Sequence, residues 1–192
     1  MLGPVIEGER TRLEPPRPEF LPSYVRWFSD PEITRYLLYR YPLTDKGEAE
    51  WLERTATDEH KVLWSIVART SGRLVGNTAL DHIDWRNRHA MSGTVIGEKD
   101  EWGKGYATES MRLRTRYAFR ELGLQKVITT VIGPNDASRR GWSGWATGSV
   151  ACIGATSWRT GRGTMSGSGR FCGTTGKLRR GAHEAAAASN AL

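Results

Sequence analysis

The chain has 192 residues and a formal net charge of +7. This length suggests one domain with room for a sizeable core. No apolar run approaches the roughly 18 residues that a membrane span needs. The N-terminus also lacks the basic segment followed by an apolar segment that marks a secretory signal. We therefore expect a cytoplasmic protein with no membrane partner.

The positive charge is concentrated in the last part of the chain. Residues 141–192 carry six Lys or Arg residues and one acidic residue, whereas residues 1–140 carry 22 basic and 20 acidic residues. The first part is nearly neutral, which argues against nucleic-acid binding, and no pattern of basic and aromatic residues supports a binder built on the tail. Both cysteines, Cys152 and Cys172, lie in the tail without metal-ligand spacing, so we expect no metal site.

Hydrophobic spacing and cap residues predict the order of the helices and strands. Apolar residues recur at helical spacing in 17–29, and β-branched residues fill 126–132. In chain order we expect a strand at 12–15, helices at 17–29, from Asp30 and at 44–57, strands at 63–69, 74–84 and 90–97, a helix at 105–122, a strand at 126–132 and a helix capped by Asn135. This order predicts an α+β, or mixed α/β, fold with an antiparallel centre.

A glycine-rich segment separates the predicted strand at 90–97 from the predicted helix at 105–122. Residues 100–110 read DEWGKGYATES. Gly103 and Gly105 allow unusual backbone angles, and the helix start supplies N–H groups and the positive end of the helix dipole. The segment therefore predicts a phosphate site, with Lys104 available for a second contact. An ordinary strand-to-helix connection is the alternative; the glycine spacings of a Walker loop and of a dinucleotide fingerprint are absent.

Four stretches of the chain resemble the GNAT acetyltransferases, and within them the RimJ/RimL branch of ribosomal-protein N-acetyltransferases. They are RTRL at 10–13 with SDPEITRY at 29–36, GRLVG at 72–76, the glycine-rich segment, and NDAS at 135–138. The resemblance covers residues 10–140. It implies a GNAT domain at 1–140, with a mostly antiparallel sheet flanked by helices, and it implies acetyl-CoA as co-substrate and an amine as acceptor.

The resemblance also implies which residues bind acetyl-CoA. In the family, amides of the glycine-rich turn bind the pyrophosphate. The pantetheine arm pairs with the strand before that turn, which here holds residues 94–96 and would separate from the neighbouring strand at 127–132. The residues implied are Thr94, Val95, Ile96, Trp102, Gly103, Lys104, Gly105, Tyr106, Ala107, Thr108, Asn135 and Ser138. Trp102 replaces the family's Gln or Arg, which removes a side-chain donor but leaves the amides.

The family's usual general base is missing from this sequence. Many relatives carry a carboxylate in an Ala-Glu-x-Gly sequence, where this chain has AMSG at 90–93. Asp81, His82 and Asp84 are the substitute candidates, and His82 and Asp84 are expected to share one face of the strand, opposite Asp81. Ser138 is a further catalytic candidate, near the thiol end. The alternatives are solvated strand polarity for the first three residues and a first-turn helix role for Ser138.

Residues 141–192 differ in composition from the rest of the chain. They hold 11 of the 22 glycines and lack hydrophobic periodicity, which predicts an irregular or disordered tail without helices or strands. A GNAT fold needs a helix and two more strands here. We therefore expect the C-terminal strands to be missing and the strand at 126–132 to lack a partner.

We interpret this tail as translated out of frame, with the shift near residues 138–141. A shifted frame joins the third base of each codon in 141–177 to the first two bases of the next codon. One amino-acid sequence that this frame permits is LERVGYRQCGVHRRYELADG, then one undetermined residue, then WYDVWLGEILRDDWE. Trp145 followed by Ala146 forces a glycine in it, because Trp has one codon. Its tyrosine after that glycine stands where many relatives keep the acid that protonates the thiolate. A natural low-complexity extension is the alternative.

The sequence thus predicts an acetyl-CoA-dependent N-acetyltransferase. The acceptor would be a primary amine, either a protein N-terminal amino group or a small amine, aminoglycoside or polyamine. The alternative is a non-catalytic acyl-CoA-binding domain, inactive because of its altered C-terminus. The sequence leaves the oligomeric state open, and a homodimer is compatible with it.

Overall fold

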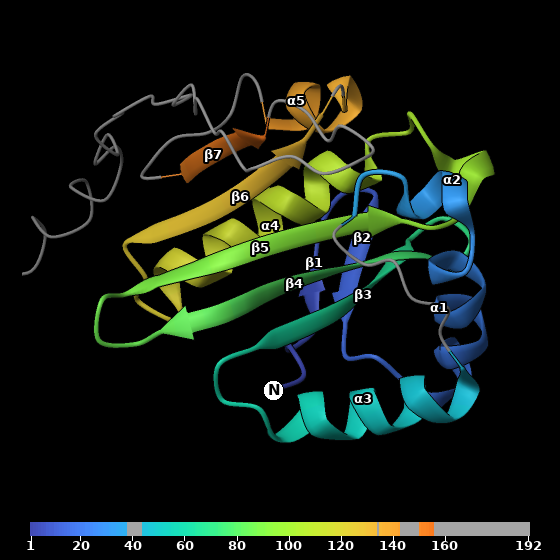
Figure 1. Cartoon of the computed structure of the whole chain (residues 1–192), viewed down its shortest axis with the longest axis horizontal. Coiled ribbons are helices and arrows are strands. Elements are labelled where there is room, and N and C mark those ends of the chain that lie inside the picture. Colours follow the sequence, from blue (N-terminus) through green and yellow to red (C-terminus); the bar gives the residue numbers. More distant parts are fainter. Residues whose placement is uncertain (38–43, 134, 143–149, 156–192) are drawn as a thin grey trace, which may run out of the picture.

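One mixed sheet organises the molecule (Figure 1). The computed structural model describes residues 1–37, 44–133, 135–142 and 150–155. Within these ranges seven strands follow one another across the sheet in chain order. They are Ile6–Glu7 (β1), Thr11–Glu14 (β2), Val62–Ala68 (β3), Leu74–Asp84 (β4), His89–Ile96 (β5), Lys126–Ile132 (β6) and Val150–Ala155 (β7). Strands β1 to β5 pair antiparallel, and β5, β6 and β7 pair parallel, so the predicted fold class is confirmed.

Helices cover both faces of this sheet. They are the short 3-10 helices Pro18–Phe20 (η1) and Lys99–Glu101 (η2), and the α-helices Leu21–Phe28 (α1), Pro31–Thr34 (α2), Asp45–Thr57 (α3), Tyr106–Arg120 (α4) and Asp136–Trp142 (α5). Leu113 and Ala118 of α4 join the large buried cluster around Trp64 on one face. Leu52 of α3 packs against Leu63 on the other face. The alternation of β3 residues therefore separates two apolar layers.

Three helix starts form as their cap residues predict. The Asp30 side chain accepts a hydrogen bond from the Glu32 N–H at 2.9 Å, and the Thr44 hydroxyl accepts one from the Gly47 N–H at 3.1 Å. Asn135 Oδ1 accepts one from the Ser138 N–H at 3.0 Å, at the start of α5. Each cap satisfies an N–H group that the helix itself leaves without a partner.

Strands β5 and β6 separate along their length. They pair from His89 with Lys126 to Ser92 with Thr129, and no described pairing joins the residues that follow. Parallel strands end at the same edge of a sheet, so the gap opens at the carboxyl edge. This is the separation that we predicted for the strand that carries Thr94, Val95 and Ile96.

The prediction that the strand at 126–132 lacks a partner is wrong. Strand β7 pairs with β6 in parallel, from Val127 with Val150 to Ile132 with Ala155. Valine, cysteine and isoleucine in this segment suit a strand, and pairing with the backbone groups of β6 offsets the entropic cost of Gly154. The rest of the predicted irregular tail lies outside the described residues. In the described part of the chain, no helix has the length and apolar character to cross a membrane.

Candidate active site

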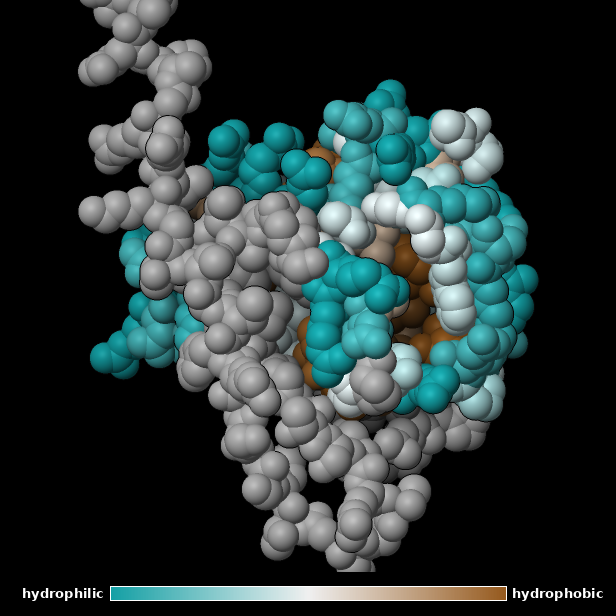
Figure 2. Space-filling view, turned by 90° about the horizontal axis from the view of Figure 1, so that it is seen from above, coloured by the Kyte–Doolittle hydropathy of each residue, from teal (hydrophilic) through white to brown (hydrophobic). Residues whose placement is uncertain are grey.

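A cavity of about 420 Å³ opens beside the gap between β5 and β6. Its walls come from α3, from the strands β3 to β5, and from Thr130 and Ile132 of β6. On the face seen in Figure 2 the molecule is hollowed, with hydrophobic residues inside the hollow and hydrophilic residues around it. This size and character suit a pocket for a small molecule.

Two of the three strand residues predicted to bind the cofactor line this cavity. They are Thr94 and Val95. Ile96 instead packs against the buried cluster that α4 covers, and its carbonyl accepts a hydrogen bond from Trp102 Nε1 at 2.8 Å. Trp102 thus folds back onto the end of β5, although its side chain stays 43% exposed.

Asp81 and His82 both line the cavity, whereas Asp84 does not. The pairing register of β4 shifts between Asp81 and Asp84, and His82 has a φ of +51°, in the left-handed region. This irregularity interrupts the alternation of the strand. The prediction that His82 and Asp84 share one face, opposite Asp81, is therefore wrong. Asp84 instead accepts hydrogen bonds from Asn87.

The Asp81 carboxylate is held in an ion pair. Lys61 Nζ lies 2.8 Å from Asp81 Oδ1, and the same ammonium sits 4.8 Å from the centre of the Trp51 ring. The charge of the Asp81 carboxylate is thus neutralised by Lys61, and Asp81 forms part of the cavity wall rather than an isolated base. Met91, where many relatives carry a carboxylate, also lines the cavity.

A buried arginine, which the sequence analysis did not predict, contacts the strands beside the gap. Arg114 of α4 has no exposed surface. Its Nη1 donates to Thr78 Oγ1 at 2.5 Å, to the Gly93 carbonyl at 2.6 Å and to Thr94 Oγ1 at 2.8 Å. Burial lowers the pKa of Arg114 to about 9, against a smaller raising by Asp81. The guanidinium is thus cationic at neutral pH and fixes β5 where it leaves β6.

The glycine-rich segment presents backbone amides at the start of α4. Gly103 and Gly105 have φ values of +79° and +89°. The Glu109 N–H reaches the Gly105 carbonyl at 3.0 Å, so the amides of 106–108 precede the first helical bond, and no described side chain caps them. A Cβ built on Gly103 would meet nothing within 4 Å. Amides that precede the first helical bond fit a phosphate group.

Two cations lie beside this segment, Lys104 and Arg10. Lys104 Nζ lies 2.9 Å from Glu101 Oε2, and this carboxylate raises the pKa of the Lys104 ammonium. Lys104 is thus ion-paired in this structure, and its contact to a second phosphate stays a prediction. Arg10, which opens the RTRL stretch but was not predicted to reach this loop, donates from Nη1 to the Lys104 carbonyl at 3.3 Å. It brings a second positive charge to the loop.

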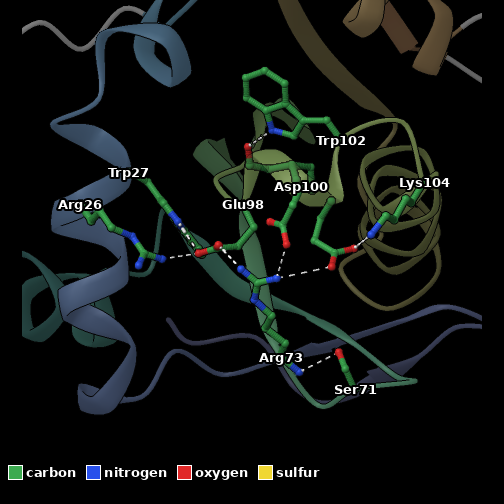
Figure 3. A network of polar contacts seen from close by, with 10 residues as sticks. Arg26, Trp27, Ser71, Arg73, Glu98, Asp100, Trp102 and Lys104 are labelled. Carbon is green, nitrogen blue, oxygen red and sulfur yellow. Dashed lines mark hydrogen bonds and ion pairs between the residues drawn. The ribbon is translucent and has the colours of Figure 1, made fainter.

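A polar network fixes the loop that leads into α4 (Figure 3). Glu98 accepts hydrogen bonds from Arg26 and Arg73, and from Trp27 Nε1 at 2.9 Å. Arg73 also donates to Asp100 at 2.6 Å. These residues come from α1, from the hairpin between β3 and β4, and from the loop itself, so the network ties three parts of the chain together.

Glu109 ties the other side of the loop to the first strands. Its carboxylate accepts hydrogen bonds from the N–H groups of Glu9, Arg10 and Thr11 and from the Thr11 hydroxyl, at 2.6 to 3.0 Å. Partial burial raises the pKa of Glu109, but the hydrogen bonds from Thr11 and from the backbone lower it, and the net shift is downward. The ionised carboxylate is thus the form that the fold stabilises.

Asn135 and Ser138 lie at the start of α5, and neither lines the cavity. Their hydrogen bond is that of a helix cap, as the alternative interpretation expected. Among the described residues, no group of three or more His, Cys, Asp or Glu side chains gathers as a metal site would require.

The family of the acetyltransferase (GNAT) domain matches residues 10–141. The chain belongs to the GNAT acetyltransferases. The match includes every stretch on which the resemblance was based. Within this GNAT domain, β5 and β6 separate after Ser92 and Thr129, and the glycine-rich loop leads into α4.

This GNAT chain is similar to two curated proteins. It is 27% identical over 117 residues to the uncharacterized N-acetyltransferase p20 of Bacillus licheniformis, covering 59% of this chain and 65% of that protein. It is 30% identical over 147 residues to the FsC-acetyl coenzyme A-N(2)-transacetylase of Aspergillus fumigatus, covering 71% of this chain and 61% of that protein. The chain thus spans less than two thirds of either relative's length.

The solved structure shows a shared fold. The spermidine N-acetyltransferase from Vibrio cholerae, in complex with CoA and spermine, matches with a TM-score of 0.58 and 18% identity, over 62% of this chain and 70% of that chain. At this identity the likeness concerns the fold alone.

Proposed function

We propose that the chain is an acetyl-CoA-dependent N-acetyltransferase that acts on a primary amine. The observation that carries the proposal is the arrangement at the carboxyl edge of β5. There β5 separates from β6, and the connecting loop delivers the amides of 106–108 at the start of α4. Family membership supports the same chemistry.

The residues present suit a CoA thioester. The amides of Tyr106, Ala107 and Thr108, with the open space at Gly103, would hold the pyrophosphate. The backbone of β5 at Thr94 and Val95 would pair with the pantetheine arm in the gap. When bound, acetyl-CoA supplies an activated acyl group.

The cavity beside the gap would take the acceptor. In the transfer a bond forms from the amine nitrogen to the acetyl carbon and the carbon–sulfur bond breaks. The amine gives up one proton, and the departing thiolate takes one up. His82 is the proposed proton acceptor, because Lys61 pairs with Asp81 and not with the His82 imidazole. Asp81 forms the cavity wall beside it. Ser138 stays a proposed residue of the thiol end.

The finer features belong to the same proposal. The RimJ/RimL-like branch and a protein N-terminal acceptor rest on the resemblance, and a cytoplasmic location and a homodimer stay predictions. We also propose that residues 1–140 form the GNAT domain and that the sequence from 141 on is out of frame. The hidden string, with its tyrosine, supports this last point.

The experiment is thiol release on mixing the chain with acetyl-CoA and a panel of primary amines, followed with a thiol reagent. We expect release that requires both the chain and an amine. The chain carrying the frame-corrected tail is assayed in parallel. Absence of amine-dependent release from both chains would overturn the proposal, and CoA binding in calorimetry without release would instead favour the non-catalytic acyl-CoA binder.

A further inference from the structure

One acidic side chain in the cavity has no role in the chemistry described so far. Glu48 of α3 lines the cavity, and only 3% of its surface is exposed. Its neighbours on the same helix face are Leu52 and Thr55, which are buried against the sheet. A carboxylate is rarely buried to this degree unless it is paired, because removing its charge from water is costly.

Glu48 has no partner of its own in the described part of the chain. No hydrogen bond or ion pair joins its carboxylate to any described residue. Lys61 is the only Lys or Arg in the described cavity lining, but its ammonium is committed to Asp81 at 2.8 Å and to the Trp51 ring. Burial raises the pKa of the Glu48 carboxyl, against a smaller lowering by Lys61. The carboxylate therefore lacks the counter-charge that would stabilise its ionised form.

The charges around the cavity leave room for one further positive charge. The Asp, Glu, Lys, Arg and His side chains of its described lining are Glu48, Lys61, Asp81 and His82. Lys61 and Asp81 neutralise each other, so Glu48 contributes the remaining negative charge when His82 is neutral. The rest of the wall is mostly apolar, and it includes Met91, where the resemblance places a carboxylate in many relatives.

We propose that Glu48 binds the ammonium group of the acceptor, and that the acceptor is a monoamine with an apolar body. This inference rests on the proposed function, since it names the acceptor of that reaction. The cavity walls at Leu63, Met91 and Val95 would contact the apolar body, and Asn77, which also lines the cavity, offers an amide for a polar group on it. A polyamine is disfavoured, because its additional ammonium groups would face apolar walls, and the described lining holds no second unpaired carboxylate.

A free monoamine and the N-terminal residue of a peptide share this chemistry, so the test includes both. Phenethylamine, methionyl-phenylalanine amide, spermidine and the neutral phenylethanol are titrated into the full chain by calorimetry at neutral pH, with CoA present. We expect phenethylamine or the peptide to bind more tightly than spermidine. The tighter of the two monoamines identifies the source of the acceptor.

The decisive variant is Glu48→Gln, which keeps the shape and removes the charge. We expect monoamine affinity to fall by about tenfold or more, since a desolvated charge pair is lost. Binding of phenylethanol and of CoA should stay unchanged. The matched control is Glu50→Gln on the exposed side of the same helix, where Glu50 lies near Lys46 and Arg54, and it should not change monoamine affinity. Thermal unfolding checks that both variants fold, and Glu48→Gln should not be less stable, because it removes a buried charge.

The outcomes separate this inference from the proposed function. Equal monoamine affinity in wild type and Glu48→Gln, tighter binding of spermidine, or no monoamine binding to a chain that binds CoA would each overturn the role of Glu48 and leave the acetyltransferase proposal in place. Absence of CoA binding by the wild type would instead contradict the proposed function itself.

Discussion

At the scale of single residues, Gly105 shows why the loop needs glycine. Its φ of +89° is a conformation that other residues rarely adopt, and an added Cβ would lie 3.0 Å from Arg10 Nη1. We predict that Gly105→Ala lowers CoA affinity about tenfold, because the strain, about 1–2 kcal/mol, displaces the amides that follow. Calorimetry with CoA measures the change.

Gly123 provides the matched control for this substitution. It lies just beyond the other end of α4 with a φ of +64°, and an added Cβ there meets only Arg88 at 3.5 Å. Gly123→Ala should lower the unfolding temperature by an amount similar to that for Gly105→Ala but leave CoA affinity unchanged. If both variants bind CoA as the wild type does, the loop is an ordinary connection between strand and helix.

The sequence pointed to some of these residues and missed others for a physical reason. The glycines predict the loop because unusual backbone angles favour glycine, which can be read directly from the sequence. Glu48 and Arg114 leave none, since a charged residue on an amphipathic helix is normally assigned to solvent. Only packing of α3 and α4 against the sheet shows that both are buried.

At the scale of secondary-structure elements, Glu109 joins α4 to the turn between β1 and β2. The carboxylate receives four hydrogen bonds, three of them from the backbone of that turn and strand. We predict that Glu109→Gln lowers the free energy of unfolding by about 2 kcal/mol at pH 7, because the amide nitrogen meets a donor where the wild type has an acceptor. Chemical denaturation measures this difference.

The same contact has a defined pH dependence. The folded-state pKa of Glu109 is shifted downward, so the stabilisation is present above the usual pKa of about 4.3 and is lost as pH falls through the lower folded value. The stability gap between wild type and Glu109→Gln should therefore shrink in acid. Glu121→Gln, at the exposed end of α4, should give no such gap at either pH. A gap that persists in acid would contradict this account.

The predicted elements agree with the structure where the signal is local. The caps at Asp30, Thr44 and Asn135 and the β-branched strand β6 each follow from neighbouring residues. Strand β7 could not be predicted in this way, because it depends on pairing with β6. The irregularity at His82 was missed for a similar reason, since alternation is a rule for regular strands.

At the scale of the whole molecule, the interpretation of residues 141–192 can be tested at the level of the gene. We predict that the coding sequence around codons 136–145 permits the hidden string in a shifted frame. A DNA sequence without such a path would contradict the interpretation. The frame-corrected chain should also unfold several degrees higher, given that each 1 kcal/mol of added stability raises the midpoint by about 2–4 °C at this size. Differential scanning calorimetry of both chains measures this.

The central claim is that the amides at the start of α4 bind the pyrophosphate of a CoA thioester. The most direct test is a titration of the isotope-labelled chain with CoA, followed by amide NMR shifts. We predict saturable shifts that are largest at Tyr106, Ala107 and Thr108. Absence of saturable shifts at millimolar CoA, or shifts confined to residues far from this loop, would contradict the account.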